Sequence, residues 1–501
     1  MSDQVYLYIA LGVYFALMLL IGYLAFRKTS DHEDYMLGGR KLPSWAAALS
    51  AGASDMSGWL IMGLPGAIFL TGLLESWIAI GLLIGSYLNW LVVAPRLRAY
   101  TEVSNNSITV PTFFENRTRD RSHSLRIVSS LIILVFFTLY VASGMVAAGK
   151  FFVTTFDGTY LAGVLGVTAV TLLYTLFGGF LGASLTDVVQ GVLMMLALIA
   201  VPIAAFIALG DLGETTTLIT ETNPAALSLF GDGSMETLSV VMYVLSGLAW
   251  GLGYFGQPHI IVRFMALKSP AEAKPARRIS LTWQFISLLG AVIAGLIGVA
   301  YFAKNGGAPD DPETVVLLLS QVLLHPLVSG FVLAAVLAAI MSTLSSQLIV
   351  TSSALVEDLF MVFQKKKPSQ STLLWLGRGA VLGIAIIATL FALNPDESVL
   401  SLVSFAWAGF GAAFGPIVLL SLYWRKLTNW GSLAGMITGA VTAFGYKWLD
   451  SEFFGLGLYE LLPAFGLALL AAIIVSLATH RQHDDIEREF NETGTIVTVK
   501  A

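Results

Sequence analysis

The feature that most constrains this chain is a series of apolar runs, each long enough to cross a lipid bilayer. The hydrocarbon core of a bilayer is about 30 Å thick, so one helical crossing needs about 20 apolar residues. We identify thirteen such runs in the 501 residues, and charged residues make up only 12% of the chain. The approximate ranges are 5–26, 44–70, 75–95, 125–155, 159–178, 184–208, 237–265, 276–303, 327–361, 372–393, 398–424, 430–448 and 456–479. The sequence therefore predicts an all-α polytopic membrane protein with about thirteen transmembrane helices.

Several other classes of protein are excluded by the composition and by the first residues. The first run follows Met-Ser-Asp-Gln without a basic segment or a small-residue cleavage site, so we expect a retained helix and not a signal peptide. The absence of cysteine excludes disulfides, thiolate metal sites and thiol catalysis. The net charge is −5 and no dense basic patch is present, so nucleic-acid binding is not expected.

The distribution of basic residues predicts the orientation. Lys and Arg accumulate in cytoplasmic loops of membrane proteins. With the N-terminus outside, 24 of the 27 basic residues, Arg263 among them, fall on the cytoplasmic side. The exceptions are Lys150, Lys304 and Lys447. We therefore expect a multi-pass protein of the plasma (inner) membrane, with a single membrane domain over residues 1–480 and a cytoplasmic tail over 481–501.

Two of the predicted crossings contain clusters of Gly, Ser and Pro. These clusters lie in the second crossing, over 49–66, and in the seventh, over 246–259. Non-helical backbone at membrane depth is tolerated where it is buried in protein or lines a cavity. The two crossings are five apart and so run in opposite directions, which predicts that helices 2–6 and 7–11 form an inverted repeat with a site at the midplane. The alternative is that these small residues only allow close helix packing.

Asp55 lies inside the second crossing. A carboxylate at mid-membrane costs at least ~2.5 kcal/mol on insertion scales, so it usually faces a cavity, a cation or a proton pathway. The alternative is a hydrogen-bonded acid that holds the helix break open. Ser342 and Thr343 in the ninth crossing offer hydroxyls suited to a hard cation such as sodium. Hydroxyls in membrane helices also bond their own preceding carbonyls, so the pair alone is weak evidence.

Aromatic side chains accompany both interruptions. They are Trp59, Tyr140, Trp250, Tyr254 and Phe255. Together they can form the apolar wall of a small-solute pocket, with Gln257 as a polar anchor. The alternative is that they belong to the core or to the interfacial aromatic belts.

Two enzyme-like patterns are excluded by their context. Gly251, Gly253 and Gly256 match GxGxxG, but no strand precedes them, so a dinucleotide site is not indicated. The six histidines are scattered and contain no HExxH pair, so no metal enzyme is indicated. We expect a transporter and not an enzyme.

Six segments resemble the sodium/solute symporter family, and within it the bacterial proline transporters. They are Leu37–Arg40, Leu49–Gly66, Thr175–Phe180 with Thr186, Asp187 and Gln190, Gly251–His259 with Arg263–Met265, Met341–Ser345, and Ser404–Pro416. The likeness covers about residues 5–479. It implies the five-plus-five inverted repeat of the leucine-transporter type and sodium-coupled uptake of L-proline.

The resemblance also implies roles for individual residues. Sodium would bind between helices 2 and 9, at the main-chain oxygens of Ala53, Met56 and Ala339 and the hydroxyls of Ser342 and Thr343. Asp55 would be required for sodium affinity, by direct ligation or through its field. Proline would contact Ser57, Gly58, Trp59, Tyr140, Trp250, Tyr254, Gln257 and Pro258. Arg40 and Asp187 would influence coupling nearer the cytoplasmic side.

Several alternatives remain open from the sequence. The same fold and sodium coupling can serve another amino acid, a vitamin or a sugar. Protons at Asp55 can replace sodium as the coupling ion. A transporter-like sensor would need a kinase domain, and the polar tail after residue 480 is too short for one.

Overall fold

The computed structural model describes residues 3–27, 37–231, 233–364, 368–394 and 398–500. No strand forms among these residues, and the only strand-like pairing among them is an isolated β-bridge between Leu42 and Leu267. The helices of the first half are α1 (Asp3–Phe26), α3 (Ser44–Asp55), α4 (Leu64–Thr71), α5 (Ser76–Leu88), α6 (Ala94–Val103), α7 (Val110–Thr118), α8 (Ser124–Phe156), α9 (Tyr160–Leu209) and α10 (Leu212–Thr222). Those of the second half are α11 (Thr237–Gly253), α12 (Pro258–Met265), α13 (Ala273–Asn305), α14 (Val315–Leu323), α15 (Pro326–Ser353), α16 (Gln370–Phe391), α17 (Val399–Tyr423), α18 (Asn429–Leu449), α19 (Leu461–Thr479) and α20 (Asp484–Lys500).

Short 3-10 and π segments lie between or extend these helices. They are η1 (Gly38–Arg40), η2 (Trp59–Gly63), η3 (Gly72–Glu75), η4 (Asn89–Val93), η5 (Tyr254–Gly256), η6 (Pro270–Glu272), η7 (Pro312–Thr314), η8 (Ala354–Phe360), η9 (Met361–Phe363) and η10 (Asp450–Phe454).

Each of the thirteen predicted runs contains helix, with non-helical residues inside the second and seventh runs and at the start of the thirteenth. Among the described residues, ten helices are long and apolar enough to cross a membrane, and two shorter apolar helices cover Tyr160–Leu176 and Pro312–Leu323. The count of ten differs from thirteen because some runs are interrupted, merged or less apolar. The fifth and sixth runs, for example, both lie in the 50-residue α9, where Gly179 has non-helical angles (φ 57°, ψ −157°). A straight helix of that length would measure about 75 Å, far more than one bilayer.

Four helices lie outside the predicted runs. They are α7, α10, α14 and α20. They have 9, 11, 9 and 17 residues, too short or too polar to resemble a membrane crossing. The apolar-run criterion therefore missed them.

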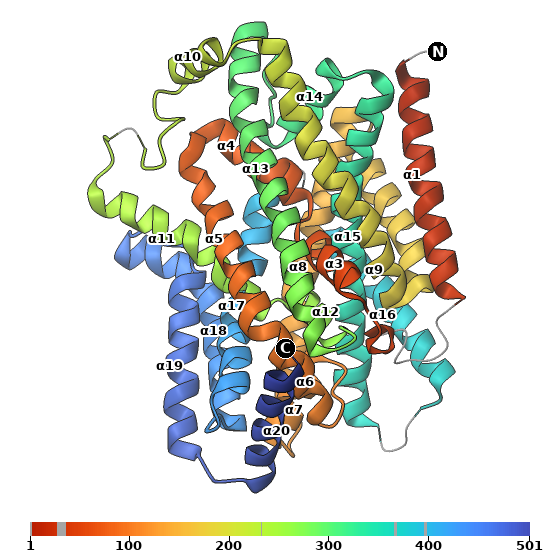
Figure 1. The fold of residues 1–501 in the computed structure, drawn as a ribbon, viewed down its shortest axis with the longest axis vertical. Coiled ribbons are helices and arrows are strands. Elements are labelled where there is room, and N and C mark those ends of the chain that lie inside the picture. Colours follow the sequence, from red (N-terminus) through yellow and green to blue (C-terminus); the bar gives the residue numbers. More distant parts are fainter. Residues whose placement is uncertain (1–2, 28–36, 232, 365–367, 395–397, 501) are drawn as a thin grey trace.

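The ends of the helices divide the molecule into two faces. In Figure 1 the start of α1, α10 and the upper part of α14 lie at the top, whereas α6, α7 and α20 lie at the bottom. The start of α1 and the short helix α10 are thus on the same side of the bundle.

Glycines bring α5 and α11 into backbone contact. A Cβ on Gly81 would lie 2.5 Å from the carbonyl oxygen of Gly247, and one on Gly85 would lie 2.2 Å from that of Gly251. Close packing through small residues is therefore real in the seventh crossing. The helix ends only after these glycines, at Gly253, so packing and interruption use different parts of one segment.

Candidate functional site

The second predicted crossing is interrupted directly after Asp55. α3 ends there, and Met56 has φ −82° and ψ 81°, outside the helical region. The Ser57 N–H bonds the Asp55 carbonyl at 3.0 Å, and the chain then continues as η2 and α4. Ser and Gly favour such a break because Ser competes for backbone hydrogen bonds and Gly adds conformational freedom.

The seventh predicted crossing is interrupted at the corresponding place. α11 ends at Gly253, η5 follows, and Gln257 is extended (φ −78°, ψ 108°) before α12 begins at Pro258. Proline suits the first position of a helix because no hydrogen bond is lost there. Both predicted breaks are therefore present, one in each half of the chain.

A hydrogen bond between Asp55 and Tyr254 joins the two breaks. The Tyr254 hydroxyl donates to Oδ2 of Asp55 at 2.5 Å and accepts from Nε2 of Gln284 in α13 at 2.8 Å. Asp55 is only 1% exposed, and its Oδ1 has no hydrogen-bond partner among the described residues. A buried carboxylate oxygen without a partner is costly, so this atom is available to a ligand.

Four of the predicted sodium ligands form one group between α3 and α15. The Ser342 hydroxyl donates to the carbonyls of Ala53 at 2.7 Å and Ala339 at 3.1 Å. The Thr343 hydroxyl donates to the Ala339 carbonyl at 3.3 Å. All four residues are buried, so four oxygen atoms that can coordinate a hard cation converge in a site closed to solvent.

Met56 and Asp55 stand at the edge of this group. Met56 is buried, and its N–H bonds the Gly52 carbonyl at 2.9 Å. Within the described part of the chain, the carbonyl of Met56 makes no hydrogen bond to the group. The Asp55 carboxylate is hydrogen-bonded to Tyr254 and not to this group. Since Asp55 follows Ala53 by two residues, its ionised form would place a negative charge near the Ala53 carbonyl.

Aromatic rings surround the main chain of Asp55. The Trp59 indole N–H and the Tyr140 hydroxyl both donate to the Asp55 carbonyl, at 3.1 and 3.3 Å. The rings of Trp59 and Trp250 lie 6.2 Å apart. The predicted aromatic wall thus comes from three separate segments that meet at the first break.

The other residues predicted to contact the solute differ in where they lie relative to the two breaks. Ser57 and Gly58 are buried in the first break, where a Cβ on Gly58 would lie 2.9 Å from that of Ala147. Gln257 donates to the Trp407 carbonyl at 3.1 Å, and its Oε1 is buried without a partner among the described residues. Pro258 lines a separate small cavity, together with Asp358. Gln257 therefore offers a free acceptor, whereas Pro258 starts α12 on the other side of the break.

Trp407 of α17 is a central residue that the sequence reasoning did not assign. Its indole N–H donates to the Trp250 carbonyl at 2.8 Å, and its ring meets that of Tyr254 edge-on at 5.1 Å. It also packs on Gly253, where an added Cβ would lie 1.9 Å from the indole nitrogen. Trp407 lies in Ser404–Pro416, one of the segments that resemble the symporter family, and this resemblance could have identified it as a candidate site residue.

Arg40 ties three segments together at the face that carries α6 and α7. Its guanidinium donates to the Met265 carbonyl at 2.8 Å, the Ser107 carbonyl at 2.7 Å and the Thr101 hydroxyl at 3.1 Å. It thereby links η1 to the ends of α6 and α12.

Asp187 lies in a buried polar network on the same side of the site. Its Oδ2 accepts from the Ser50 hydroxyl at 2.7 Å and from Nη2 of Arg263 at 3.2 Å. Arg263 also donates to the Ser346 hydroxyl at 2.6 Å. The network connects α3, α9, α12 and α15, the helices that carry Ser50, Asp187, Arg263 and Ser346.

Arg263 lies inside the bundle and not in a loop. The orientation count assigned it to the cytoplasmic side, and the structure shows that it is only 1% exposed and lies within α12. It is paired with Asp187, which makes the buried charge tolerable. Its position inside the predicted seventh crossing was the signal that it does not belong to a loop.

The predicted site is closed to solvent, and a cavity lies next to it on one side. A cavity of about 320 Å³ is lined by Glu75, Tyr243, Trp250, Ser401 and Tyr459. Trp250 forms its floor, since this ring also contacts Trp59 beside Asp55. Tyr459 stacks on Trp250 with 5.3 Å between ring centroids. An aromatic layer therefore separates the cavity from the breaks.

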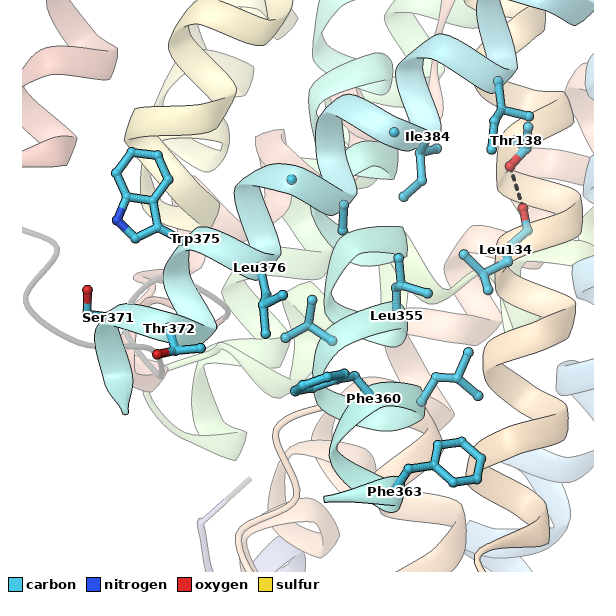
Figure 2. A pocket seen from close by; sticks show the side chains of 16 residues that line it. Leu134, Thr138, Leu355, Phe360, Phe363, Ser371, Thr372, Trp375, Leu376 and Ile384 are labelled. Carbon is cyan, nitrogen blue, oxygen red and sulfur yellow. Dashed lines mark hydrogen bonds between the residues drawn. The ribbon is translucent and has the colours of Figure 1, made fainter. Parts of the chain in front are cut away.

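A larger cavity lies away from the breaks. It has about 1120 Å³ and is formed by α8, η8 and α16. Figure 2 shows that its walls are mainly hydrocarbon, and that the Thr138 hydroxyl bonds the Leu134 carbonyl of its own helix. It lacks the charged and polar groups that converge at Asp55, so we do not assign it to the site.

Comparison with known proteins places this geometry in a family. The model of the sodium:solute symporter family matches residues 35–439. The chain belongs to the sodium:solute symporter family. Among its relatives, the osmoregulated proline transporter OpuE of Bacillus subtilis is 53% identical over 474 residues, which are 94% of this chain and 95% of that protein. The sodium/proline symporter of Escherichia coli is 47% identical over 484 residues, or 96% and 94% of the two chains.

Solved structures support the fold of this sodium:solute symporter. A substrate-bound, outward-open Na⁺-coupled sialic acid symporter superposes with a TM-score of 0.79 at 19% identity, over 95% of this chain and 99% of that one. MhsT in complex with L-phenylalanine gives 0.53 at 15% identity, over 87% and 98%. The predicted fold, an all-α membrane protein of the leucine-transporter type, is confirmed.

Proposed function

We propose that this chain couples sodium entry to the uptake of L-proline by alternating access, without chemical conversion of the solute. The observation that carries the proposal is the Asp55–Tyr254 hydrogen bond, which joins the two interrupted helices beside four convergent oxygen donors. The relatives described above, at about half identity over nearly the whole chain, support proline as the solute.

The proposed sodium ligands are the carbonyls of Ala53, Met56 and Ala339 and the hydroxyls of Ser342 and Thr343. The two hydroxyls now donate to the Ala53 and Ala339 carbonyls. A sodium ion would replace these hydrogen bonds with ion–oxygen contacts. The lone pairs of the hydroxyl and carbonyl oxygens would then all point to the ion. The carboxylate of Asp55 supplies the negative charge that favours a cation in a buried site.

The proposed proline site lies on the other side of Asp55. The apolar pyrrolidine ring would pack against Trp59, Tyr140 and Trp250. Its charged groups would meet Ser57, Gly58, Tyr254, Gln257 and Pro258 at the two breaks. Half-helix N-termini favour an anionic group and freed carbonyls favour a cationic one, which suits a zwitterion.

Sodium and proline would act on the same segment. Sodium would order the chain from Ala53 to Met56, and that order would prepare the adjacent breaks for the solute. Because the coupling between two ligands is reciprocal, proline would raise sodium affinity by the same factor. The membrane potential contributes about 2.3 kcal/mol per charge per 100 mV to accumulation.

Alternating access would open one face at a time. The aromatic layer of Trp250 and Tyr459 would close the route from the cavity of about 320 Å³, which on this proposal opens to the outside. The Arg40 contacts and the Asp187–Arg263 network would close the opposite face, and both would influence coupling. We further propose that residues 1–480 form one transport unit in the plasma (inner) membrane, with the N-terminus outside and the tail 481–501 cytoplasmic.

The test is uptake by the purified chain in liposomes. An inward sodium gradient should drive accumulation of labelled proline, and unlabelled proline should compete better than other amino acids, a vitamin or a sugar. Stronger competition by another solute would overturn proline as the substrate. Uptake that persists without sodium and follows a pH gradient would overturn sodium coupling.

A further inference from the structure

A cavity whose charged lining is mainly basic lies beside the start of α20, and none of its lining residues belongs to the two helix breaks. It has about 720 Å³ and is formed by the loop after α7, the α17–α18 connection, the end of α19 and the start of α20. Five Arg or Lys side chains and a single acidic one line it. The basic residues are Arg119, Arg121, Arg425, Lys426 and Arg481, and the acidic one is Glu487.

Contacts of α20 use part of this positive charge. Glu489 forms an ion pair with Arg119 at 2.5 Å, and Asn491 accepts from Arg425 at 2.8 Å. The ring of Phe490 lies under the guanidinium groups of Arg96 and Arg425, at 4.7 and 5.2 Å. These contacts hold α20 in place against the ends of the bundle.

Three basic side chains at the cavity are left over. Arg121, Lys426 and Arg481 are exposed, and none forms a salt bridge or side-chain hydrogen bond to a described residue. Basic residues are common on cytoplasmic faces in general, but here three that are unpaired among the described residues line the same cavity. Guanidinium groups in particular match the geometry of phosphate oxygens.

The cavity lies at the level where membrane helices end. α17 ends at Tyr423, α18 begins at Asn429 and α19 ends at Thr479, all beside the cavity. Trp430, which also lines the cavity, is 56% exposed, as expected for a ring at the membrane–water interface. A ligand here would therefore sit at headgroup depth.

We propose that this cavity binds the phosphate group of an anionic phospholipid. Basic pockets between helices at a cytoplasmic surface are suited to anionic headgroups. Arg121, Lys426 and Arg481 would contact the phosphate, and Thr428 and Thr479 would offer hydroxyls at its rim. A bound headgroup would bridge the start of α20 to the α17–α18 connection.

The experiment measures retention of phosphatidylglycerol and phosphatidylcholine by the purified full chain in native mass spectrometry. The test variant is R121Q/K426Q/R481Q. The matched control is K268Q/K274Q/R278Q, which removes the same charge from exposed residues around η6 and the start of α13. The variant R121K/R481K keeps the positive charges and tests whether charge without the guanidinium groups is enough for lipid retention. Gel filtration checks the folding of all variants.

We expect wild type and control to prefer phosphatidylglycerol equally, and the test variant to bind it about tenfold or more weakly. R121K/R481K should keep most of the preference. Equal retention by wild type and test variant would overturn the proposal, and so would equal losses in both triple variants. A parallel measurement with soluble glycerol phosphate tests whether the phosphate belongs to a lipid or to a free molecule. Binding of glycerol phosphate without any preference for phosphatidylglycerol over phosphatidylcholine would overturn the proposal that the ligand is a lipid.

Discussion

At the residue scale, the carboxylate of Asp55 has two different oxygen atoms. Oδ2 accepts the Tyr254 hydroxyl, whereas Oδ1 is buried without a hydrogen-bond partner among the described residues. A charged group in this position costs free energy until a cation or donor completes its surroundings. This asymmetry leaves both roles open to Asp55: attracting sodium by its field, and ligating it through Oδ1.

Replacing Asp55 with Asn should sharply weaken sodium-dependent uptake. The amide keeps the size of the side chain but removes its negative charge, so we expect the half-saturating sodium concentration to rise at least about tenfold. Tyr254→Phe is the matched comparison, because it removes the hydrogen bond and leaves the charge. Unchanged sodium dependence of proline uptake in D55N would contradict the assignment.

Replacing Ser342 with Ala should also weaken sodium binding. The change removes one oxygen donor and leaves the Ala53 carbonyl without its partner, so a roughly tenfold loss of sodium affinity is expected. Thr351→Ala is the control, since Thr351 lies on the same helix and bonds only its own helix at Gln347. Sodium titrations of proline uptake would separate the two, and equal effects would argue for a general change in α15.

At the scale of elements, the two broken helices are held by contacts on opposite faces. Trp250 and Tyr459 cover one side, and the Arg40 contacts join η1, α6 and α12 on the other. Because these contacts cannot all persist while either face opens, removing one set should favour opening of that face.

Replacing Arg40 with Gln should shift the protein toward the state open on the Arg40 side. The chain has no cysteine, so a single cysteine at Ser404, which is half-buried in the lining of the cavity above Trp250, reports opening of the face that we propose to be external. We expect its labelling by an impermeant thiol reagent to slow several-fold in R40Q, because the outer face would be closed more often. Arg278→Gln, an exposed control, should leave the rate unchanged, and faster labelling in R40Q would reverse the proposed role.

At the scale of the whole molecule, the orientation in the membrane has a direct test. Thr217 in α10 and Thr498 in α20 are both exposed, and Figure 1 shows α10 at the top of the bundle and α20 in its lower part. In intact cells, an impermeant reagent should label T217C rapidly and T498C only after permeabilisation. The reverse pattern would invert the proposed topology.

The helices and their interruptions were predictable because they depend on local sequence. Bilayer thickness demands long apolar runs, and Gly, Ser and Pro inside them mark breaks wherever the chain folds. Asp55, Ser342 and Trp59 were recognisable for the same reason: polar and aromatic residue types stand out within or beside such breaks. The short helix α14 and the polar α20 carried no comparable local signal.

Tertiary structure alone decided which of these groups meet. Asp55 and Tyr254 are 199 positions apart, and their hydrogen bond depends on how two whole helices pack. The ion pair between Arg263 and Asp187, 76 positions apart, likewise depends on where the fold places α12 and α9. Phe490 took a place among arginines because α20 folds back under the bundle. Local composition determines that a segment enters or leaves the membrane, whereas long-range contacts depend on which helix faces are buried together, and no single segment encodes that.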